Sequence, residues 1–421
     1  MKIHIFVALA MVMQYTILAL EYPELELQNK IFKGYNSNVR PVKNCSKPVV
    51  VTVGLALRKV LYLDEMRQSF KSTMNINLYW HDESLQWNKS EFHGIKNVEI
   101  PYNKNIWIPD LMVLNALDRP ENLGVQDAFI RLNDIGQVYV WTQTNLETAC
   151  GIRTKKYPYD LQVCDIVITK FMSSDAKIEI RPLEKHVYMD DYVEIAEWKI
   201  EDTSVGTTVI PFNITLSAEA DFPLFDIVNY TSITYTLTLK RSCKLCFFNI
   251  ILPVLILGVL NFLTFFVPCE SGEKLSNPIA MFLTLAVFLT TITRSLPESI
   301  DGASYLSLYV TFQLAVSAMI LLCAVTSLHI HHKKRKSYIH YIVCQITKCF
   351  RRKQTQMKGC KNMNSSYEDN YIENGRSKTL SERYENFHSD GLSKAFDMLM
   401  FYVFGLCEVI ATITFSIFIW N

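Results

Sequence analysis

The sequence lacks an excess of charge of either sign. Its 42 lysines and arginines are balanced by 41 aspartates and glutamates, which leaves a formal charge of +1 over 421 residues. A nucleic-acid-binding surface needs a clear basic excess, so no nucleic-acid partner is expected. The apolar share of 49% is also too high for a disordered chain. The composition therefore favours a membrane protein of average charge.

The sequence also lacks the motifs that mark most enzymes and metal sites. No nucleophile elbow, phosphate-binding loop or pair of catalytic carboxylates stands in a fitting context, so we expect neither an enzyme nor a cofactor. Cys243 and Cys246 form a lone C-x-x-C. A zinc site needs more than two ligands, so we expect no metal there but either a local disulfide or two thiols.

The first twenty residues have the pattern of an export signal. Lys2 precedes an apolar stretch that begins at Ile3 and continues to Met13. A short basic start followed by an apolar core predicts a secretory signal peptide over residues 1–20. A membrane anchor is the alternative, because the cleavage site has no clean Ala-x-Ala pattern. Export would place the following residues in an oxidising compartment, where cysteines tend to form disulfides.

The rest of the chain divides into two kinds of sequence. Residues 21–243 alternate short β-branched and aromatic runs with turn residues, which predicts an extracellular, immunoglobulin-like β-sandwich. Four apolar runs follow, each long enough at ~1.5 Å per residue to cross a hydrocarbon core of ~30 Å. They cover residues 246–267, 275–296, 305–328 and 396–419. The prediction is a four-helix transmembrane bundle, with three helices in 244–328 and the fourth, with an extracellular C-terminus, in 395–421.

Basic residues indicate how the chain is oriented in the membrane. A run from His331 to Lys336 follows the third apolar run, and Lys-rich and Arg-rich loops stay in the cytoplasm. Residues 329–394 are therefore predicted to be a cytoplasmic loop, largely flexible, whose end can become helical. The N-terminal domain then lies outside the plasma membrane. Four N-x-[ST] sequons in this domain are candidate glycosylation sites: Asn44, Asn88, Asn213 and Asn229.

One pair of cysteines encloses the motif that carries a family resemblance. Thirteen residues separate Cys150 from Cys164, and Tyr157-Pro158-Tyr159-Asp160 lies among them. This closely resembles the signature loop of Cys-loop receptors, which are pentameric ligand-gated ion channels. Trp107-Ile108-Pro109-Asp110 looks like the nicotinic members in particular. The resemblance implies a disulfide between Cys150 and Cys164, a coupling loop formed by Tyr157, Pro158, Tyr159 and Asp160, and a homo- or hetero-pentamer around a central pore.

A stripe of smaller or more polar residues recurs at helical spacing in the second apolar run. The stripe consists of Ser276, Ala280, Leu283, Val287, Thr290, Thr291 and Arg294. Such a stripe can also be a helix-packing face. The resemblance implies that it lines the pore, where Leu283 and Val287 would form an apolar constriction that closes by dewetting.

Two acids precede this stripe. Glu270 and Glu273, repeated by symmetry, would form carboxylate rings that favour cations at the cytoplasmic mouth. Anion-selective relatives usually carry Pro-Ala-Arg here, so we expect a cation channel. Arg294 at the outer mouth should lower its conductance. Because a proline stands near the start of the helix, we expect the regular helix to begin at Asn277.

The resemblance also implies a ligand site at subunit interfaces, where nicotinic receptors hold a quaternary ammonium among aromatic rings. This chain departs from that box. The matching positions are Asn75, Leu114, Phe171, Phe222, Leu224, Phe225 and Tyr230. Either Phe222 or Phe225 matches one tyrosine of the box, and both tryptophans of the box are replaced. We therefore expect acetylcholine affinity to fall by orders of magnitude and the site to suit apolar ligands.

The altered box resembles that of the cephalopod chemotactile receptors, nicotinic relatives that detect poorly soluble molecules by contact. The resemblance implies a cation-selective channel that acts as a chemoreceptor for hydrophobic molecules such as terpenoids. Two alternatives stay open: a channel gated by an acetylcholine-like neurotransmitter, and an accessory subunit without a principal binding face. Permeant cations and membrane lipids are further expected partners. A soluble ligand-binding module would fit the β domain but not the four spans.

Overall fold

The computed structural model of the chain describes residues 23–101, 106–117, 123, 128–171, 173–212, 228–295, 302–332 and 377–420. The side chains of residues 101, 211, 212, 228, 295, 377–392 and 420 are not part of this description. The expected signal peptide and most of the expected cytoplasmic loop lie outside the described residues. So do four candidate site residues: Asn213, Phe222, Leu224 and Phe225.

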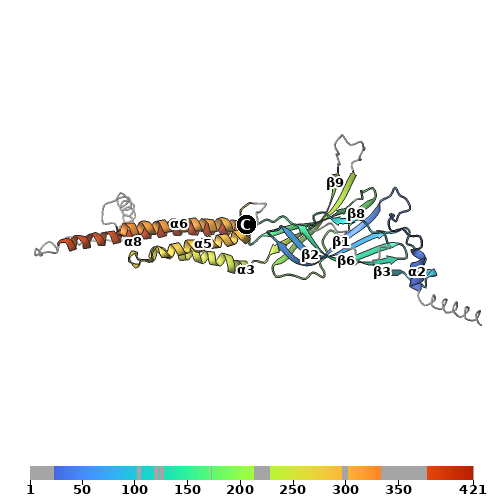
Figure 1. Cartoon of the computed structure of the whole chain (residues 1–421), viewed down its shortest axis with the longest axis horizontal. Helices are drawn as coiled ribbons and strands as arrows, with labels where there is room; N and C mark the ends of the chain where they lie inside the picture. The colour runs from blue at the N-terminus through green and yellow to red at the C-terminus, as the bar shows by residue number, and fades with distance from the viewer. Residues whose placement is uncertain are drawn as a thin grey trace, which may run out of the picture. The chain divides into compact units, whose positions relative to one another are not determined.

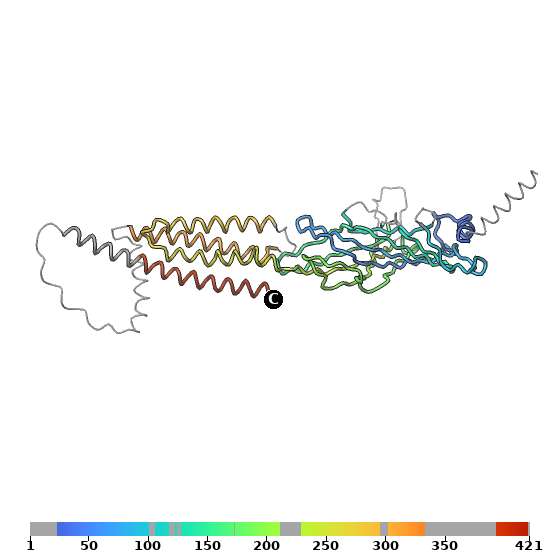
Figure 2. Tube along the Cα trace, turned by 90° about the horizontal axis from the view of Figure 1, so that it is seen from below, coloured from blue at the N-terminus to red at the C-terminus, as the bar shows by residue number. Residues whose placement is uncertain are grey.

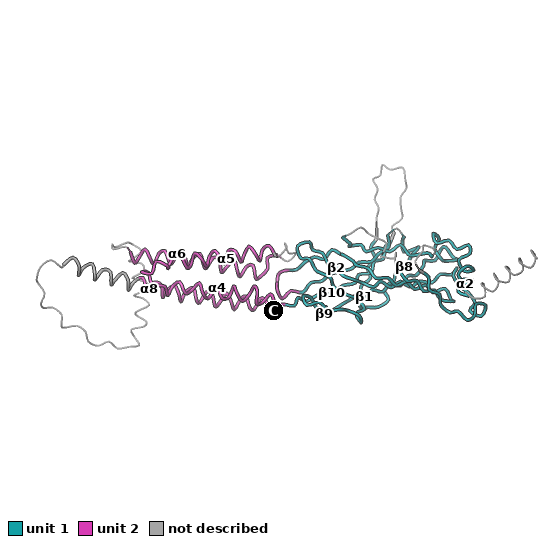
Figure 3. Tube along the Cα trace, turned by 60° about the horizontal axis from the view of Figure 1, so that its bottom comes forward, with its two compact units in different colours: residues 1–153, 161–242 teal, residues 154–160, 243–421 magenta. Residues whose placement is uncertain are grey.

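The described residues form two compact units (Figure 3). The first contains the residues up to 153 together with 161–242, and the second contains 154–160 together with the residues from 243 onward. The first unit holds two β-sheets, and the second holds four helices that are long and apolar enough to span a membrane. The expectation of a β-sandwich followed by four transmembrane helices is confirmed.

Among the described residues, the first unit begins with a helix, α2 (Pro23–Ile31), and continues as strands (Figure 1). The strands are β1 (Val49–Asp64), β2 (Ser69–His81), β3 (Asn97–Pro101), β4 (Leu111–Val113), β5 (Phe129–Asn133), β6 (Gln137–Ala149), β7 (Leu161–Lys170), β8 (Ile178–Pro182), β9 (Trp198–Phe212) and β10 (Val228–Arg241). A 3-10 turn, η1 (Lys89–Glu91), precedes β3. The strand orders are β3-β5-β6-β2-β1-β8 in one sheet and β4-β7-β10-β9 in the other.

Alternating side chains build the core between these sheets. In β2, Met74, Ile76 and Leu78 are all at most 1% exposed, while the residues between them belong to the opposite face. Tyr235 of β10 is also buried, and its hydroxyl donates to the carbonyl of Val53 in β1 at 2.8 Å. A buried hydroxyl needs such a partner. This bond therefore satisfies the one polar atom that Tyr235 brings into the core and links the two sheets.

The second unit is a helical bundle (Figure 2). Its first span joins α3 (Lys244–Cys246), a π-helical turn η3 (Phe247–Ile251), α4 (Leu252–Phe262) and a 3-10 turn η4 (Leu263–Phe266). A short turn, η5 (Cys269–Ser271), leads to α5 (Ser276–Ser295), which is followed by α6 (Tyr305–His332) and α8 (Ser377–Trp420). The α6 helix contacts both α5 and α8, and α4 contacts all three.

The helix ends differ from those expected. The α5 helix begins at Ser276 rather than Asn277, α6 continues past residue 328 to His332, and α8 begins at Ser377. Hydropathy detects only the apolar part of a helix. Backbone hydrogen bonding continues into polar segments, so α6 and α8 are longer than their apolar runs, whereas α5 is one residue shorter than its run at each end.

A polar cluster lies inside the bundle. Gln313 of α6 donates to Glu408 Oε1 of α8, and the Tyr309 hydroxyl donates to the same oxygen at 3.1 Å. Gly258 of α4 faces this cluster: a Cβ there would lie 3.2 Å from Gln313 Nε2 and 3.3 Å from Glu408 Oε1. The glycine therefore lets three helices approach around the half-buried carboxyl group of Glu408.

Candidate functional site

Three candidate ligand-binding residues lie on the outward face of the four-stranded sheet. Leu114 follows β4, Phe171 follows β7, and Tyr230 is the third residue of β10. Leu114 is 50% exposed and Phe171 is 55% exposed, whereas Tyr230 is half-buried. Each is in phase with the outward positions of its strand, because the alternate positions are buried throughout β4 and β7 and from Ile233 onward in β10. The described part of the site is therefore apolar and aromatic.

The strand register brings two of these residues together. When the antiparallel register of β7 and β10 is continued to the strand ends, Phe171 comes opposite Tyr230. Leu114 lies elsewhere, because its amide donates to the carbonyl of Val167 at 2.7 Å. Val167 is four residues, or ~13 Å, from Phe171 along the strand direction. Phe171 and Tyr230 thus form the centre of the described site, and Leu114 lies at its margin.

Asp110 fixes the segment that carries Phe171. The Asp110 carbonyl accepts a hydrogen bond from the Phe171 amide at 2.9 Å. Its carboxylate Oδ2 accepts another from the Ser173 amide at 3.1 Å. These bonds determine where the chain leaves β7, so Asp110, the last residue of the Trp-Ile-Pro-Asp motif, positions the segment that carries Phe171.

A buried lysine lies directly before Phe171. The Lys170 side chain is 0% exposed and ion-pairs with Asp175, and its ammonium also donates to the Ile178 carbonyl at 3.1 Å. Asp175 accepts from the amide and the hydroxyl of Thr231 at 3.1 and 2.9 Å. The network ties the segment after β7 to β10, and sequence reasoning did not identify it.

Burial has a further effect on this lysine. It lowers the pKa of the Lys170 ammonium to about 8, while the carboxylates of Asp110 and Glu179 act in the opposite direction. The charge of the network therefore changes within the range of pH in which proteins are studied. Because Thr231 adjoins Tyr230 in β10, this charge change lies beside the candidate ligand-binding aromatics.

Asn75 lies on the other sheet and is buried. It is 6% exposed in β2, between Ala56 of β1 and Gln143 of β6. Its Oδ1 has no hydrogen-bond partner among the described residues. In this single chain, therefore, Asn75 presents little surface to a ligand.

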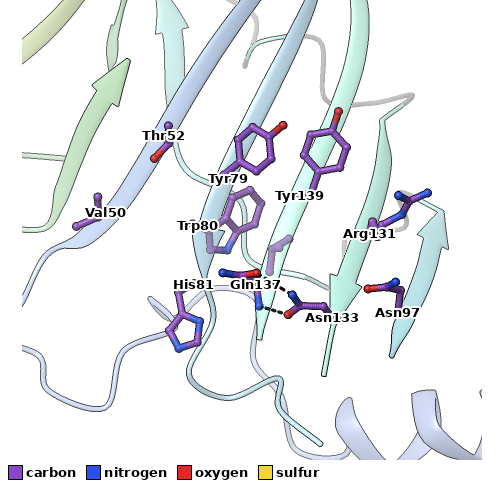
Figure 4. Close-up of a pocket in the computed structure, with 11 residues that line it drawn as sticks. Val50, Thr52, Tyr79, Trp80, His81, Asn97, Arg131, Asn133, Gln137 and Tyr139 are labelled. Atoms are coloured by element: carbon purple, nitrogen blue, oxygen red, sulfur yellow. Dashed lines mark hydrogen bonds between the residues drawn. The ribbon is translucent and has the colours of Figure 1, made fainter. Parts of the chain in front are cut away.

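A hollow on the outward face of the same sheet was not predicted (Figure 4). Its volume is about 440 Å³. It is lined by Val50, Thr52, Tyr79, Trp80, His81, Asn97, Arg131, Asn133, Gln137, Val138 and Tyr139. The rings of Tyr79 and Tyr139 stack with centroids 4.7 Å apart, and burial raises the pKa of Tyr139 to about 12. The lining comes from five strands, so only their pairing reveals it.

The expected coupling loop is closed by a disulfide between Cys150 and Cys164. Within the helical unit, Tyr157 is 8% exposed and belongs to a buried cluster with Ile251 and Val254 of the first span. At the start of α6, the Tyr305 amide donates to the Lys155 carbonyl at 3.0 Å. The loop therefore contacts two membrane-spanning segments through side-chain packing and a backbone hydrogen bond.

The stripe in α5 is exposed in the single chain. Exposed residues of this helix include every member of the stripe: Ser276, Ala280, Leu283, Val287, Thr290, Thr291 and Arg294. Leu283 is 58% and Val287 is 63% exposed, whereas Ile292 is 3% exposed and packs into the bundle. The stripe is therefore not the packing face within this chain.

Glu270 and Glu273 precede α5 and are both exposed. Between them Gly272 has a φ of +68°, a left-handed conformation that glycine adopts without steric cost. Lys274, the next residue after Glu273, ion-pairs with Asp397 of α8. The turn therefore presents two carboxylates to solvent while the adjacent lysine is buried.

Three of the expected glycosylation sites are described. Asn44, Asn88 and Asn229 are exposed. The Asn88 side chain accepts from the Ser90 amide at 3.1 Å, as the cap of η1. An attached sugar needs surface access, and all three positions provide it.

Comparison with known families covers both units. The neurotransmitter-gated ion-channel ligand binding domain matches residues 24–243, and the neurotransmitter-gated ion-channel transmembrane region matches residues 250–415. The first match alone spans more than half of the chain.

Curated relatives agree with this assignment. The acetylcholine receptor subunit alpha of Danio rerio is 28% identical over 317 residues, which cover 75% of this chain and 67% of the relative. The neuronal acetylcholine receptor subunit alpha-6 of Homo sapiens is 28% identical over 312 residues, or 74% of this chain and 60% of the relative. The chain belongs to the neurotransmitter-gated ion-channel family, as a nicotinic-like subunit of a ligand-gated channel that spans the plasma membrane with its ligand-binding domain outside the cell.

Proposed function

We propose that the chain assembles as a homo- or hetero-pentamer into a cation-selective channel that detects poorly soluble, hydrophobic molecules such as terpenoids by contact. The observation that carries the ligand class is the exposure of Leu114 and Phe171, at 50% and 55%, on the outward face of the four-stranded sheet. These two side chains expose aliphatic and aromatic surface to a ligand.

The residue types at the described site support an apolar ligand over a quaternary ammonium. A cation is held best by tryptophan and less well by phenylalanine, with each contact contributing ~0.5–2 kcal/mol. Phe171 and Tyr230, at the centre of the described site, have rings that attract a cation less strongly than tryptophan does. Leu114 has no ring to attract a cation. Phenylalanine in place of tryptophan still offers apolar area to an uncharged ligand, because apolar stabilisation is proportional to the area removed from water.

Cation selectivity is supported by the charge before α5. Glu270 and Glu273 are exposed, whereas Lys274 is buried in an ion pair with Asp397 and does not offset them at the surface. Five symmetry-related copies would surround the pore entrance with carboxylates, which attract cations and repel anions.

The ligand class is tested by expressing the full chain in oocytes, alone and with related subunits. Terpenoids and acetylcholine are applied while the membrane current is recorded. We expect currents with terpenoids and little response to acetylcholine. Robust gating by acetylcholine with no response to any hydrophobic compound would refute the ligand class.

Selectivity is tested separately by ion substitution. The reversal potential should follow the sodium gradient and not the chloride gradient. Glu273→Ala should weaken this preference, whereas Glu99→Ala, which removes an exposed carboxylate in the β unit, is the matched control and should leave it unchanged. A reversal potential that follows chloride would contradict the proposal.

An accessory role is the second candidate, and one observation favours it. Asn75 matches a tryptophan of the nicotinic complementary face, yet it is 6% exposed and offers no aromatic surface. A chain of this kind could contribute the pore but only part of a binding site. If the chain gives no membrane current when it is expressed alone but gives current together with a related subunit, the accessory role is supported.

A further inference from the structure

Cys243 and Cys246 have no part in the proposed function, and they lie in a helical turn that suits disulfide chemistry. Cys243 is the N-cap of α3 and Cys246 is the last residue of that helix. The Phe247 amide donates to the Cys243 carbonyl at 3.0 Å, which closes the turn. Residues three apart in a helix have Cα atoms ~5 Å apart, and a disulfide spans ~4.4–6.8 Å. The backbone can therefore accept a bond between these two sulfurs.

The sulfur of Cys243 contacts the coupling loop. The Cys243 thiol donates a hydrogen bond to the Pro158 carbonyl. Burial raises the pKa of the Tyr159 hydroxyl, and Cys243 and Cys246 both raise it further through their electrostatic effect. Each cysteine is also partly exposed. Small reagents therefore have access to a pair of thiols that adjoins the loop.

The loop rests on the span that begins with these cysteines. Tyr157 packs with Ile251 and Val254, which follow Cys246 by less than three helical turns. A change in the turn that carries the cysteines therefore acts directly on the segment that contacts the loop. Among the described residues, no third histidine, cysteine or carboxylate joins the pair to make a metal site.

We propose that Cys243 and Cys246 form a reversible thiol–disulfide site whose reactants are small extracellular disulfides of the glutathione type. One thiol loses its proton and attacks a sulfur of the small disulfide, which releases one small thiol and leaves a mixed disulfide. The second cysteine attacks the protein sulfur of that bond and releases the second small thiol. The two protein thiols are oxidised, the small disulfide is reduced, and both protons end on the released thiols.

Oxidation at this site has a structural consequence. A disulfide sulfur carries no proton, so Cys243 can no longer donate to the Pro158 carbonyl. The coupling loop then loses one hydrogen bond to the first span. Reduction restores the thiol and the bond. The site thus makes the contact between loop and helix dependent on the redox state outside the cell.

The chemistry is tested on the purified full-length channel. The protein is treated with oxidised glutathione, remaining thiols are alkylated, and the peptide that contains both cysteines is analysed by mass spectrometry. We expect a peptide that resists alkylation and lacks two hydrogen atoms, and dithiothreitol should restore both thiols. Cys246→Ser should stop at a glutathione adduct on Cys243. Alkylation of both thiols, or an adduct that persists in the natural chain, would overturn the proposal.

The effect on gating is tested with an agonist found in the ligand panel, and this part rests on the proposed function. Cys243→Ala should require about fivefold more agonist, as expected for the loss of one ordinary hydrogen bond. Cys243→Ser keeps a donor and should behave like the reduced natural chain. Oxidised glutathione should shift the natural chain as the alanine variant does, and should leave the double serine variant unchanged. If the alanine variant and the oxidised chain need the same agonist concentration as the reduced chain, the gating effect is refuted. The mass measurement decides the chemistry independently of any agonist.

Discussion

Lys274 and Asp397 form an ion pair in which the two side chains are only 1% and 6% exposed. Lys274 follows Glu273 directly, so the pair fixes the candidate selectivity acid relative to α8. In addition, Asp397 Oδ1 is buried without a hydrogen-bond partner among the described residues. The ion pair with Lys274 is therefore the main interaction that offsets the free-energy cost of burying the Asp397 carboxylate.

Removal of one partner of this ion pair should strongly destabilise the protein, because it leaves the other charge buried and uncompensated. For Asp397→Leu we expect a loss of ~3–5 kcal/mol in the free energy of unfolding and a marked fall in surface expression. The double variant Lys274→Met with Asp397→Leu should recover most of both, since no charge then remains. Thermal unfolding of the purified channel and surface labelling measure the effect. Equal losses in the single and double variants would show that the ion pair is not the cause.

Lys170 predicts a dependence of stability on pH. Its pKa is about 8 in the folded chain, against an ordinary value of 10.5. Between these values the folded state binds fewer protons than the unfolded state, so this group makes the free energy of unfolding rise with pH, by at most ~1.4 kcal/mol per pH unit. Lys170→Met should remove that contribution. Thermal unfolding from about pH 8 to 10 checks it, and equal slopes in both proteins would contradict it.

Phe171→Trp should bring back a response to acetylcholine. Tryptophan holds a cation better than phenylalanine, and a gain of ~0.5–2 kcal/mol corresponds to roughly a 2- to 30-fold lower effective concentration. Phe129→Trp is the matched control, because Phe129 is also exposed, at 66%, but belongs to β5 of the other sheet. Dose–response curves for acetylcholine measure the shift. A shift of equal size in both variants would argue against a local effect at Phe171.

Leu283→Thr should raise the current that flows without ligand. If Leu283 forms an apolar constriction, a hydroxyl at each of five positions makes wetting easier and favours the open pore. Leu308→Thr serves as the control, because Leu308 is similarly exposed, at 55%, but lies on α6. Leak current normalised to surface expression is the measurement. Comparable leak in both variants would indicate general disturbance of the bundle.

The order of the elements could be predicted from local patterns, whereas contacts between them could not. Apolar length alone identified the four spans, and the resemblance of the segment from Cys150 to Cys164, with its Tyr-Pro-Tyr-Asp motif, to the signature loop of Cys-loop receptors implied the disulfide that closes it. Both signals lie within short stretches of sequence. The extension of α6 to His332 has no such signal, because a helix can continue in polar sequence.

Residues whose role depends on strand pairing were harder to predict. Lys170 is buried because it takes an inward position at the end of β7 and meets Asp175 there, and nothing in its immediate sequence indicates this. Tyr79 and Tyr139 lie sixty residues apart and stack only because β2 and β6 pair in one register. The same register buries Asn75, which the resemblance to nicotinic receptors had suggested as part of a ligand site.

The placement of the coupling loop also has a consequence for the order in which the chain is made. Residues 150–164 leave the ribosome before the first helical span, which begins at Lys244. The loop can thus be closed by its disulfide while the apolar partners of Tyr157, Ile251 and Val254, do not yet exist. Until they are inserted in the membrane, Tyr157 remains uncovered and presents an apolar surface to chaperones. A subunit truncated before α3 would keep Tyr157 uncovered, because the residues that share its buried cluster would never be made.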